Sequence, residues 1–304
     1  MHPKKKVFFW SPMLSHVGTI KAVEKSAFSL KKYLNHDVYL INVFGEFDYL
    51  QYDKNFYILN IFAYRKWPKT GLISKIIIYT FTVLSVIKLI YFYNKFRPDV
   101  IISNLVGYLP NILKFFYPKL ITINSIQGLP KFNFLRKIIW RLFYSKSDTI
   151  MTMTNITKKN IINNINYQNN ILKVENPIIS SKIRKLSDED IKKEELKLFN
   201  HITFCALGRL TRQKNFIDII KAVNIIPKEF HLKFNVIIIG SGEDKENLTS
   251  YIKKKGIQNI FLLGFKENPY PYIKHSDYFI SSSLWEEPGH AILEAAYLTK
   301  LIDR

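Results

Sequence analysis

Lys6-Val-Phe-Phe-Trp10 is an apolar stretch of strand length, and a segment with helical spacing of apolar residues follows it over Ile20–Leu34. The next apolar stretch of strand length is Val38-Tyr-Leu-Ile-Asn-Val-Phe44. A buried strand, a helix and a second buried strand in this order form the unit from which parallel sheets are built. The beginning of the chain therefore predicts an α/β fold with a parallel sheet.

The same alternation of apolar runs and helical segments extends through the rest of the 304 residues, which are enough for two domains. A long apolar helix is predicted over residues 73–96, where Arg97-Pro-Asp99 stops it. A charged, glycine-free segment from Lys182 to Lys197 lacks a strand pattern and suits a linker. We expect two doubly wound domains and a linker with the following bounds: first domain 1–185, linker 186–200, second domain 201–304.

The net charge of +21 is distributed unevenly along the chain. Residues 1–200 hold 31 Lys and Arg against 13 Asp and Glu, an excess of 18, whereas residues 201–304 hold 14 against 11, an excess of 3. A basic domain suits a polyanionic partner such as a nucleic acid or an anionic membrane, and a generally basic, solvated surface is the alternative. Because no nucleic-acid-binding motif accompanies the charge, we expect no nucleic-acid partner.

Two segments of the first domain bear on a membrane partner. Residues 131–146 interleave basic and aromatic side chains, which suits a helix in a membrane interface and equally a sheet-flanking helix with a solvated basic face. The apolar run Ile73–Phe92 contains Lys75 and Lys88, whereas a membrane-spanning helix needs roughly 20 largely uncharged residues. We therefore expect no transmembrane helix.

The single cysteine, Cys205, excludes an internal disulfide and favours a reducing, cytoplasmic compartment. No secretory signal is predicted, because Ser11-Pro12 ends the first apolar stretch too early for a hydrophobic signal core. His and Cys residues form no ligand cluster in the sequence. The sequence therefore shows no metal-binding pattern.

Two carboxylates near the end of the chain, Glu286 and Glu294, stand on either side of a backbone break at Pro288-Gly289. An apolar strand pattern beginning at Tyr278 precedes them, and a helix-forming run follows the break. The unit is therefore predicted to be a strand, a short loop and a helix. Carboxylates at such a loop can bind hydroxyl groups.

Proline and glycine suit the start of this helix, so the amides of Gly289, His290 and Ala291 are expected to point outward. Such a helix terminus attracts phosphate, because the N–H donors and the helix dipole act together. A phosphate site beside two carboxylates suits a sugar nucleotide.

Glycines follow several of the predicted strands. Gly18 lies in the first strand-to-helix loop, where open α/β sheets bind ligands, although a lone glycine equally suits an ordinary turn. Gly240-Ser-Gly242 follows another strand, but the full G-x-G-x-x-G pattern of dinucleotide sites is absent there.

Taken in order, these features resemble a family 4 glycosyltransferase of the GT-B fold, which has two Rossmann-like domains facing a cleft. Four matches carry the resemblance in the second domain: Gly208-Arg-Leu210 with Lys214, Gly240-Ser-Gly-Glu243, Gly264-Phe265, and the E-x7-E motif from Glu286 to Glu294. Loop signatures of the family also match in the first domain, at Ser11-Pro12 with Gly18, at Ser125–Pro130 and at Asn176-Pro177.

The resemblance implies a role for each of these residues. Arg209 and Lys214 would bind the donor diphosphate and offset its charge as it leaves. Glu286 would contact the donor sugar, Glu294 the ribose hydroxyls, and the backbone at Gly264-Phe265 the base. The resemblance also implies retention of the anomeric configuration without a metal or another cofactor, with the departing phosphate taking the acceptor proton.

The sequence departs from the family pattern in three places. Glu287-Pro288 stands where the family commonly has glycine after the first motif glutamate, and Gln127 stands where a histidine is frequent. We therefore assign no catalytic base. A family member would continue beyond Arg304, which predicts a truncated chain with an incomplete second domain.

The resemblance thus predicts a retaining, hexosyltransferase-type enzyme that moves a sugar from a nucleotide-diphosphate sugar to a lipid-linked saccharide acceptor. Surface polysaccharide, capsule or lipopolysaccharide assembly is the expected setting. The first domain would face the acceptor and an anionic membrane surface, and the protein would be cytoplasmic and peripheral on the inner face of the cytoplasmic membrane. The alternative is a catalytically inactive, truncated remnant that binds a sugar nucleotide or a membrane.

Overall fold

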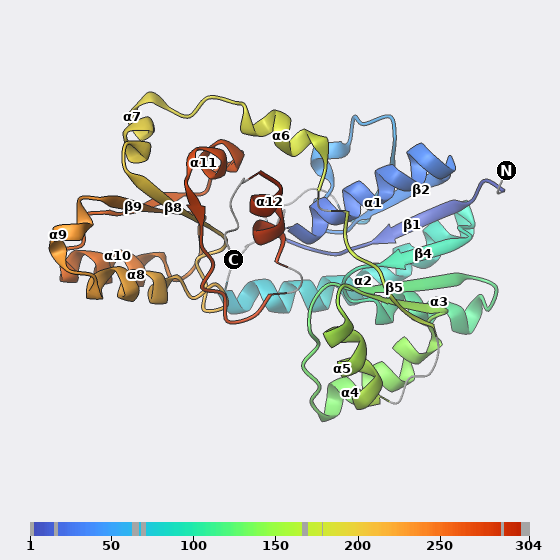
Figure 1. Ribbon diagram of the computed structural model, residues 1–304. Helices are drawn as coiled ribbons and strands as arrows, with labels where there is room; N and C mark the ends of the chain where they lie inside the picture. The colour runs from blue at the N-terminus through green and yellow to red at the C-terminus, as the bar shows by residue number, and fades with distance from the viewer. Residues whose placement is uncertain are drawn as a thin grey trace. The chain divides into compact units, whose positions relative to one another are not determined.

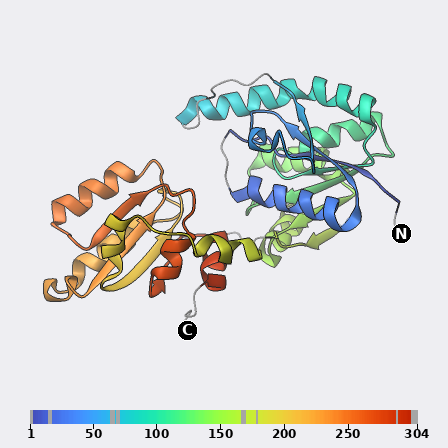
Figure 2. The ribbon, with the colours of Figure 1, turned by 90° about the horizontal axis from the view of Figure 1, so that it is seen from above.

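The structure of the protein is a computed structural model, and it describes residues 3–14, 18–62, 67, 71–165, 170–177, 179–286 and 289–298. The chain divides into two compact units, Met1–Pro177 and Ile178–Arg304. Each unit contains a parallel sheet with helices packed against it (Figures 1 and 2). The predicted α/β fold with two domains is confirmed.

The described strands of the first unit form a seven-stranded sheet in the order β3-β2-β1-β4-β5-β6-β7. Every neighbouring pair in this sheet is parallel. The strand order reverses between β1 and β4, and open α/β sheets bind their ligands at such a switch point. The strands are β1 (Lys6–Trp10), β2 (Asp37–Asn42), β3 (Tyr57–Asn60), β4 (Val100–Ser103), β5 (Ile121–Ile126), β6 (Thr149–Thr152) and β7 (Ile171–Lys173).

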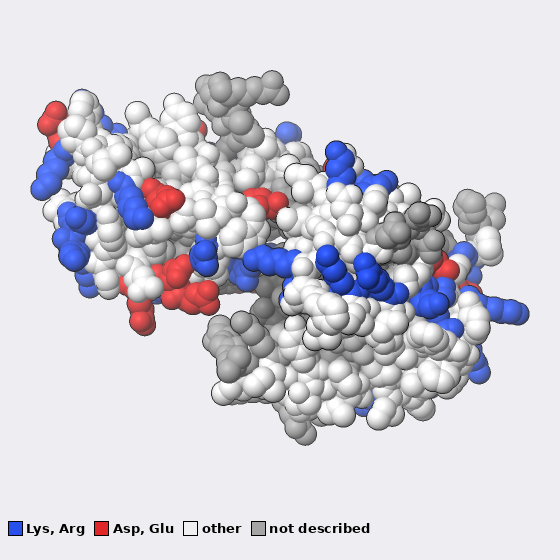
Figure 3. All heavy atoms as spheres, turned by 90° about the horizontal axis from the view of Figure 1, so that it is seen from below, with Lys and Arg blue, Asp and Glu red and all other residues white. Residues whose placement is uncertain are grey.

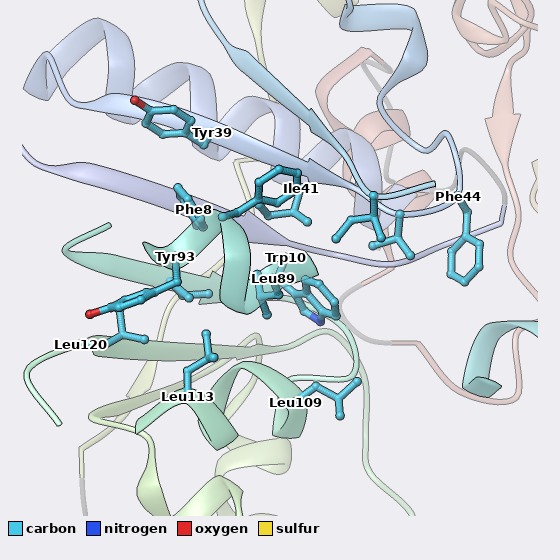
Figure 4. Close-up of a cluster of buried hydrophobic side chains, with 14 of the residues drawn as sticks. Phe8, Trp10, Tyr39, Ile41, Phe44, Leu89, Tyr93, Leu109, Leu113 and Leu120 are labelled. Carbon is cyan, nitrogen blue, oxygen red and sulfur yellow. The ribbon is translucent and has the colours of Figure 1, made fainter. Parts of the chain in front are cut away.

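Helices cover both faces of this sheet, which explains why β1 is apolar at every position from Val7 onward. Val7 and Phe9 pack in a cluster with residues of α1, whereas Phe8 and Trp10 point to the other face and pack with residues of α2 and α3 (Figure 4). The helices of the unit are α1 (Gly18–Leu34), α2 (Gly71–Phe96), α3 (Tyr108–Phe116), α4 (Phe134–Leu142) and α5 (Asn155–Ile165), with 3-10 turns η1 (Asp48–Leu50) and η2 (Tyr144–Lys146).

The helix α2 confirms the apolar helix predicted over residues 73–96 and has two different faces. Leu89 and Tyr93 are buried in the core cluster under the helix, while Ile76, Ile87 and Tyr91 are more than half exposed on the outer side. By length and composition, α2 is the one helix among the described residues that is suited to crossing a membrane. Of its most apolar stretch, 28% is buried inside the protein. Its inner face is that of a helix covering a parallel sheet.

The second unit contains a smaller parallel sheet in the order β10-β9-β8-β11. Its described strands are β8 (Ile202–Leu207), β9 (Phe234–Ile239), β10 (Ile260–Gly264) and β11 (Tyr278–Phe279). Its helices are α6 (Ser181–Ser187), α7 (Lys193–Leu196), α8 (Phe216–Ile225), α9 (Lys228–His231), α10 (Lys245–Lys255), α11 (Tyr270–His275) and α12 (His290–Leu298), with the 3-10 turn η3 (Lys197–Phe199).

The predicted linker over residues 186–200 is part of the second unit, and the division lies earlier, after Pro177. The charged residues there cover a short amphipathic segment. Ile191 and Leu198 are buried in a core cluster with Tyr272 and Ile273 of α11, and Glu195 pairs with Lys266. The prediction of a solvated linker, which was based on the charged composition, is therefore wrong. The apolar residues Ile191 and Leu198 anchor the segment in the core of the second unit.

The loop after β2 contains a buried carboxyl group, Glu46, which is 4% exposed. Its two oxygens accept hydrogen bonds from the backbone N–H groups of Val43 at 3.1 Å and Phe44 at 2.6 Å. Burial outweighs these bonds and raises the pKa of Glu46 from 4.5 to about 8. The folded state therefore keeps a proton that the unfolded state releases at lower pH.

We predict that the free energy of unfolding falls as the pH rises from about 5 to 8, because the unfolded state then binds fewer protons than the folded state. Glu46→Gln should flatten this fall, since the amide does not titrate. Urea unfolding at a series of pH values measures the slope, with Glu229→Gln on the surface as the matched control. An unchanged slope in Glu46→Gln would contradict the assignment.

Candidate functional site

The loops that follow β8, β9 and β10 lie side by side at the carboxyl edge of the second sheet. The Gly208 N–H donates to the carbonyl of Ile239 at 3.0 Å, and the Gly240 N–H donates to the carbonyl of Gly264 at 2.8 Å. The strand ends are thus joined by backbone hydrogen bonds beyond the strands themselves. This edge is the usual position of ligand sites in parallel α/β sheets.

Glycine is required at two positions because the first two loops approach each other closely. Gly240 has φ +145°, and a Cβ atom there would overlap the carbonyl oxygen of Gly208. A Cβ atom on Gly242 would overlap the carbonyl oxygen of Leu210, which also accepts the N–H of Asp244 at 3.0 Å. The Gly-Ser-Gly turn therefore serves the contact between two protein loops.

The two predicted diphosphate-binding residues lie in the loop after β8. Arg209 is exposed between two anchored neighbours, since Gly208 bonds to Ile239 and the Leu210 N–H donates to the carbonyl of Ser241 at 2.9 Å. The aliphatic stem of Lys214 packs on Gly208, where a Cβ atom would lie only 3.0 to 3.2 Å from three stem carbons. Two cationic side chains are therefore held at one strand end.

Glu286 forms an ion pair with Lys214, and both side chains are largely buried, at 20% and 15% exposed. The hydroxyl of Ser283 donates to the same carboxylate oxygen, Oε1, at 2.6 Å. Each is a charge-assisted hydrogen bond, a class stronger than bonds between neutral groups. The structure thus brings together two residues that are 72 positions apart in the chain.

Backbone contacts hold the loop of Glu286 against the loop of Lys214. The Leu284 N–H donates to the carbonyl of Gln213 at 2.9 Å, and the Gln213 side chain donates to the carbonyl of Trp285 at 3.1 Å. The Ser282 hydroxyl donates to the carbonyl of Lys214 at 2.9 Å. The predicted strand before Glu286 is shorter than expected, ending at Phe279, because these loop contacts replace the pairing of β11 with β8.

The second motif glutamate lies in α12, which begins at His290, directly after the Pro288-Gly289 break at which the helix start was predicted. Gly289 precedes the helix with φ +83°, and its carbonyl accepts the N–H groups of Ile292 and Leu293. Tyr270 of α11 donates to Glu294 Oε1 at 3.0 Å. Burial and the Glu294 carboxylate raise the pKa of Tyr270 well above its usual value, so this phenol remains a hydrogen-bond donor at neutral pH.

Sequence reasoning missed the residues that position the two carboxylates. Ser283 and Tyr270 carried only weak signals, namely a hydroxyl run directly before Glu286 and an aromatic residue in a short helix. Gln213 carried none, because its role depends on a loop that is distant in sequence. A spacing pattern identifies the charged groups of such a site but not the neutral groups that orient them.

Some predicted positions lie apart from this group. Gly264 ends β10 with φ +72°, and Phe265 after it is 73% exposed. Gly18 is the first residue of α1, and both Gly18 and Gln127 belong to the first unit. Ala291 follows His290 in α12. Glu287-Pro288 and residues 299–304 lie outside the described residues.

The arrangement in the second unit suits an anionic ligand that also carries hydroxyl groups. Arg209 and Lys214 supply positive charge. The first turn of α12 supplies backbone N–H donors, as the first turn of any helix does. Within the described ranges, no group of three or more His, Cys, Asp or Glu residues is placed to hold a metal ion. The expectation of a cofactor-free reaction stays a prediction.

Comparison with known sequences places this geometry in context. Residues 187–302 match the family model described as "Glycosyl transferases group 1". An uncharacterized glycosyltransferase of Methanocaldococcus jannaschii is 30% identical over 250 residues, which are 76% of this chain and 59% of that protein. A capsular polysaccharide biosynthesis glycosyltransferase of Staphylococcus aureus is 27% identical over 166 residues, which are 53% of this chain and 42% of that protein. These similarities support the group 1 glycosyltransferase family, and the matched part of the chain spans 59% and 42% of these two relatives' lengths.

Solved structures confirm the fold. A glycosyltransferase from Rickettsia africae aligns with a TM-score of 0.75 at 17% identity, covering 99% of this chain and 79% of that one. An Anabaena protein solved in complex with UDP aligns with a TM-score of 0.68 at 15% identity, covering 95% and 78%. At these identities the likeness concerns the fold alone, and the fold is that of the GT-B glycosyltransferases.

We predict that Gly242→Ala destabilises the second unit by about 1–3 kcal/mol, because the added methyl group displaces the Leu210 backbone. Urea unfolding measures the change. Gly128→Ala is the matched control, since a Cβ there meets no atom within 4 Å, and it should change stability by no more than about 0.5 kcal/mol. Equal effects of the two substitutions would contradict the close approach of the loops.

Proposed function

We propose that this protein transfers a sugar, with retention of configuration, from a nucleotide-diphosphate sugar to a saccharide acceptor. The observation that carries the proposal is the Lys214–Glu286 ion pair beside Arg209, at the carboxyl edge of the second sheet. All three residues lie within the range that matches the glycosyltransferase family model. The UDP complex of the structurally similar Anabaena protein supports a nucleotide diphosphate as part of the donor.

The cationic groups would bind the donor diphosphate. The Arg209 guanidinium offers two parallel donors to phosphate oxygens. The Lys214 ammonium has three donors, of which Glu286 takes one, so Lys214 can bind a phosphate while the ion pair persists. The first-turn amides of Gly289, His290 and Ala291 would add backbone donors. Together these groups offset the negative charge that builds on the diphosphate as it leaves.

The two carboxylates would bind hydroxyl groups of the donor. Glu286 accepts from Lys214 and Ser283, so its orientation is set before a sugar hydroxyl arrives. Glu294, held by Tyr270, would accept from the ribose, and the backbone at Gly264-Phe265 would meet the base. A carboxylate already engaged by an ammonium is a poor nucleophile and a poor acid, which favours the binding role over the acid and nucleophile roles of a hydrolase.

The reaction itself would occur on one face of the sugar. The acceptor hydroxyl oxygen forms a bond to the anomeric carbon as the bond from that carbon to the phosphate oxygen breaks. The hydroxyl proton passes to the departing phosphate, so no separate base and no metal or cofactor is invoked. Attack from the side of departure gives retention.

The acceptor would be a lipid-linked saccharide of a surface polysaccharide. The similarity to the Staphylococcus aureus capsule glycosyltransferase supports this setting. We propose a cytoplasmic location on the inner face of the membrane, where a lipid-linked acceptor and nucleotide sugars are both accessible.

The first unit would bind the anionic membrane surface. Figure 3 shows a broad uncharged area on the right-hand part of the molecule, next to a row of Lys and Arg side chains. The outer side of α2 carries exposed apolar residues along its length, from Ile73 to Tyr91. An apolar helix face with basic residues nearby suits insertion into the interface of an anionic bilayer. On α4, Phe134 and Leu142 are exposed as well.

Glu286→Gln should lower the rate of sugar transfer by about 10²–10³, because the donor sugar loses its charged acceptor and Lys214 its partner. Arg209→Ala should weaken binding of the nucleotide diphosphate. Release of nucleotide diphosphate from a panel of nucleotide sugars measures the first, and calorimetry with UDP and GDP measures the second. Glu229→Gln is the control, since Glu229 is exposed and lies outside the four motifs.

Wild-type turnover in Glu286→Gln would refute the assigned role of Glu286. Binding of a nucleotide sugar without turnover by the unmodified protein would favour the alternative of an inactive binding remnant. The folded state of each variant is checked by thermal denaturation. Bound nucleotide should raise the midpoint temperature of unfolding.

We predict that Ile87→Asn weakens co-sedimentation with anionic vesicles at least about threefold, because a 74% exposed side chain of α2 would no longer enter the bilayer. Ile225→Asn is the matched control, since Ile225 is 81% exposed but lies in the second unit. Vesicles of phosphatidylglycerol and of phosphatidylcholine separate charge from apolar insertion. Equal binding of both variants would contradict a membrane role for α2.

A further inference from the structure

A cavity of about 300 Å³ lies at the amino edge of the first sheet, away from the carboxyl edge where parallel α/β sheets usually bind ligands. Lys5, Asp99 and Leu120 directly precede β1, β4 and β5, and all three line this amino-edge cavity. The end of α2 and the segment between α3 and β5 supply the other walls. The volume is at the small end of ligand pockets and suits a single small ligand.

The described lining of the amino-edge cavity is strongly basic. Its cations are Lys5, Arg97 and Lys119, and its one carboxylate is Asp99. Within the described residues none of the three cations forms an ion pair. Asp99 does not pair with them either, because its Oδ2 accepts the backbone N–H of Lys6 at 2.7 Å. An excess of two positive charges thus faces the cavity without a partner among these residues.

The end of α2 fixes the position of Arg97. The Arg97 N–H donates to the carbonyl of Tyr93 at 2.8 Å, and its φ of +49° lies in the left-handed region, which residues other than glycine seldom adopt. The guanidinium carbon lies 5.7 Å from the centroid of the Tyr93 ring, in a cation–π contact. This contact uses the face of the guanidinium. Its N–H donors lie in the plane of the group and remain available to a ligand.

Tyr93 supplies a neutral hydroxyl to the same cavity. The residue is 8% exposed, and its ring stacks on Tyr117 with centroids 3.9 Å apart. Figure 4 shows the hydroxyl pointing away from Trp10, toward the amino end of the sheet. The hydroxyl has no hydrogen-bond partner within the described ranges, and its oxygen is not among the unpartnered atoms that are closed to solvent. A ligand in the cavity can therefore reach this donor.

We propose that the amino-edge cavity binds a phosphate monoester or inorganic phosphate. Such a group carries about 1.5 to 2 negative charges at neutral pH and several acceptor oxygens. The charge matches the excess of two positive charges, and the oxygens match the ammonium, guanidinium and phenol donors. The inference stands apart from the proposed transfer reaction, because the charged residues of that reaction lie in the second unit.

The phosphate group has two possible sources with the same chemistry. One is a free phosphate compound. The other is a lipid headgroup with a terminal phosphate, which would reach the cavity from a bilayer in contact with the exposed apolar side of α2. The basic lining recognises the phosphate group in both cases, and the experiment separates the sources.

Calorimetry on the full chain at fixed ionic strength tests the binding, with inorganic phosphate and glycerol 3-phosphate as probes and glycerol as the uncharged control. Both phosphate compounds should bind with a dissociation constant of about 1 mM or lower, and glycerol should not bind. Arg209→Ala is titrated in parallel, because the proposed donor site also attracts phosphate. Binding to the amino-edge cavity should persist in this variant.

Two variants locate the binding. Lys119→Gln removes an exposed ammonium group and should weaken phosphate binding about fivefold. Tyr93→Phe removes only a hydroxyl and keeps the ring that stacks on Tyr117, so it should weaken binding about threefold with the fold intact. Lys159→Gln is the matched control, since Lys159 is exposed in α5 of the same unit and does not line the cavity, and it should bind as the unmodified chain does.

Vesicles distinguish the two sources. Phosphatidic acid presents a phosphate monoester, whereas phosphatidylglycerol presents a diester, and the two are compared in phosphatidylcholine at equal surface charge. A lipid source predicts stronger co-sedimentation with phosphatidic acid, a preference that Tyr93→Phe should reduce. A free source predicts equal co-sedimentation with both vesicles, together with phosphate binding in the calorimetric titration.

Three results would overturn the proposal. The first is no phosphate binding at about 10 mM. The second is binding that Arg209→Ala abolishes and Lys119→Gln leaves unchanged, which would place the phosphate in the second unit. The third is unchanged binding in Tyr93→Phe with equal weakening in Lys119→Gln and Lys159→Gln, which would reduce the effect to the general charge of the surface.

Discussion

The close contact between the backbones of Gly240 and Gly208 is the constraint on which the second unit depends. It is possible only because Gly240 has no side chain, since a Cβ atom there would lie 1.9 Å from the carbonyl oxygen of Gly208. The hydrogen bonds of Gly208 to Ile239 and of Gly240 to Gly264 hold the loops at this separation. Backbone contacts therefore anchor the loop after β8 to the loop after β9. Arg209 and Lys214 project from it at defined positions, and the Glu286 loop docks against it through backbone bonds.

The two units carry different groups at the carboxyl ends of their strands. In the second unit, cationic side chains and engaged carboxylates are gathered at a strand edge, which suits a charged and hydroxylated donor. In the first unit, a cavity at the carboxyl ends of β4 and β5 is bounded by amides, hydroxyls and aromatic rings. No described residue that lines this cavity is charged, so the positive charge of the first unit lies outside the cavity.

Composition was a weaker guide than periodicity at the unit boundary and at α2. The segment 186–200 was predicted to be a linker because it is charged, yet Ile191 and Leu198 pack it into the second core. The run over residues 73–96 was predicted not to cross a membrane because it contains lysines. Which of its side chains are buried depends, however, on which side of the helix faces the sheet. One face of α2 is core and the other is apolar and exposed, a distinction that a hydropathy average does not contain.

The sequence by itself determined the α/β architecture, because strand-length apolar runs alternate with helical spacing and both faces of β1 must be buried. It also predicted a helix directly after the Pro288-Gly289 break, and α12 begins there at His290. Tertiary structure alone decided that Lys214 pairs with Glu286 and that Ser283 and Tyr270 orient the carboxylates. Each of these depends on contacts between residues distant in the chain, which arise only when parallel strands bring their carboxyl ends to one edge.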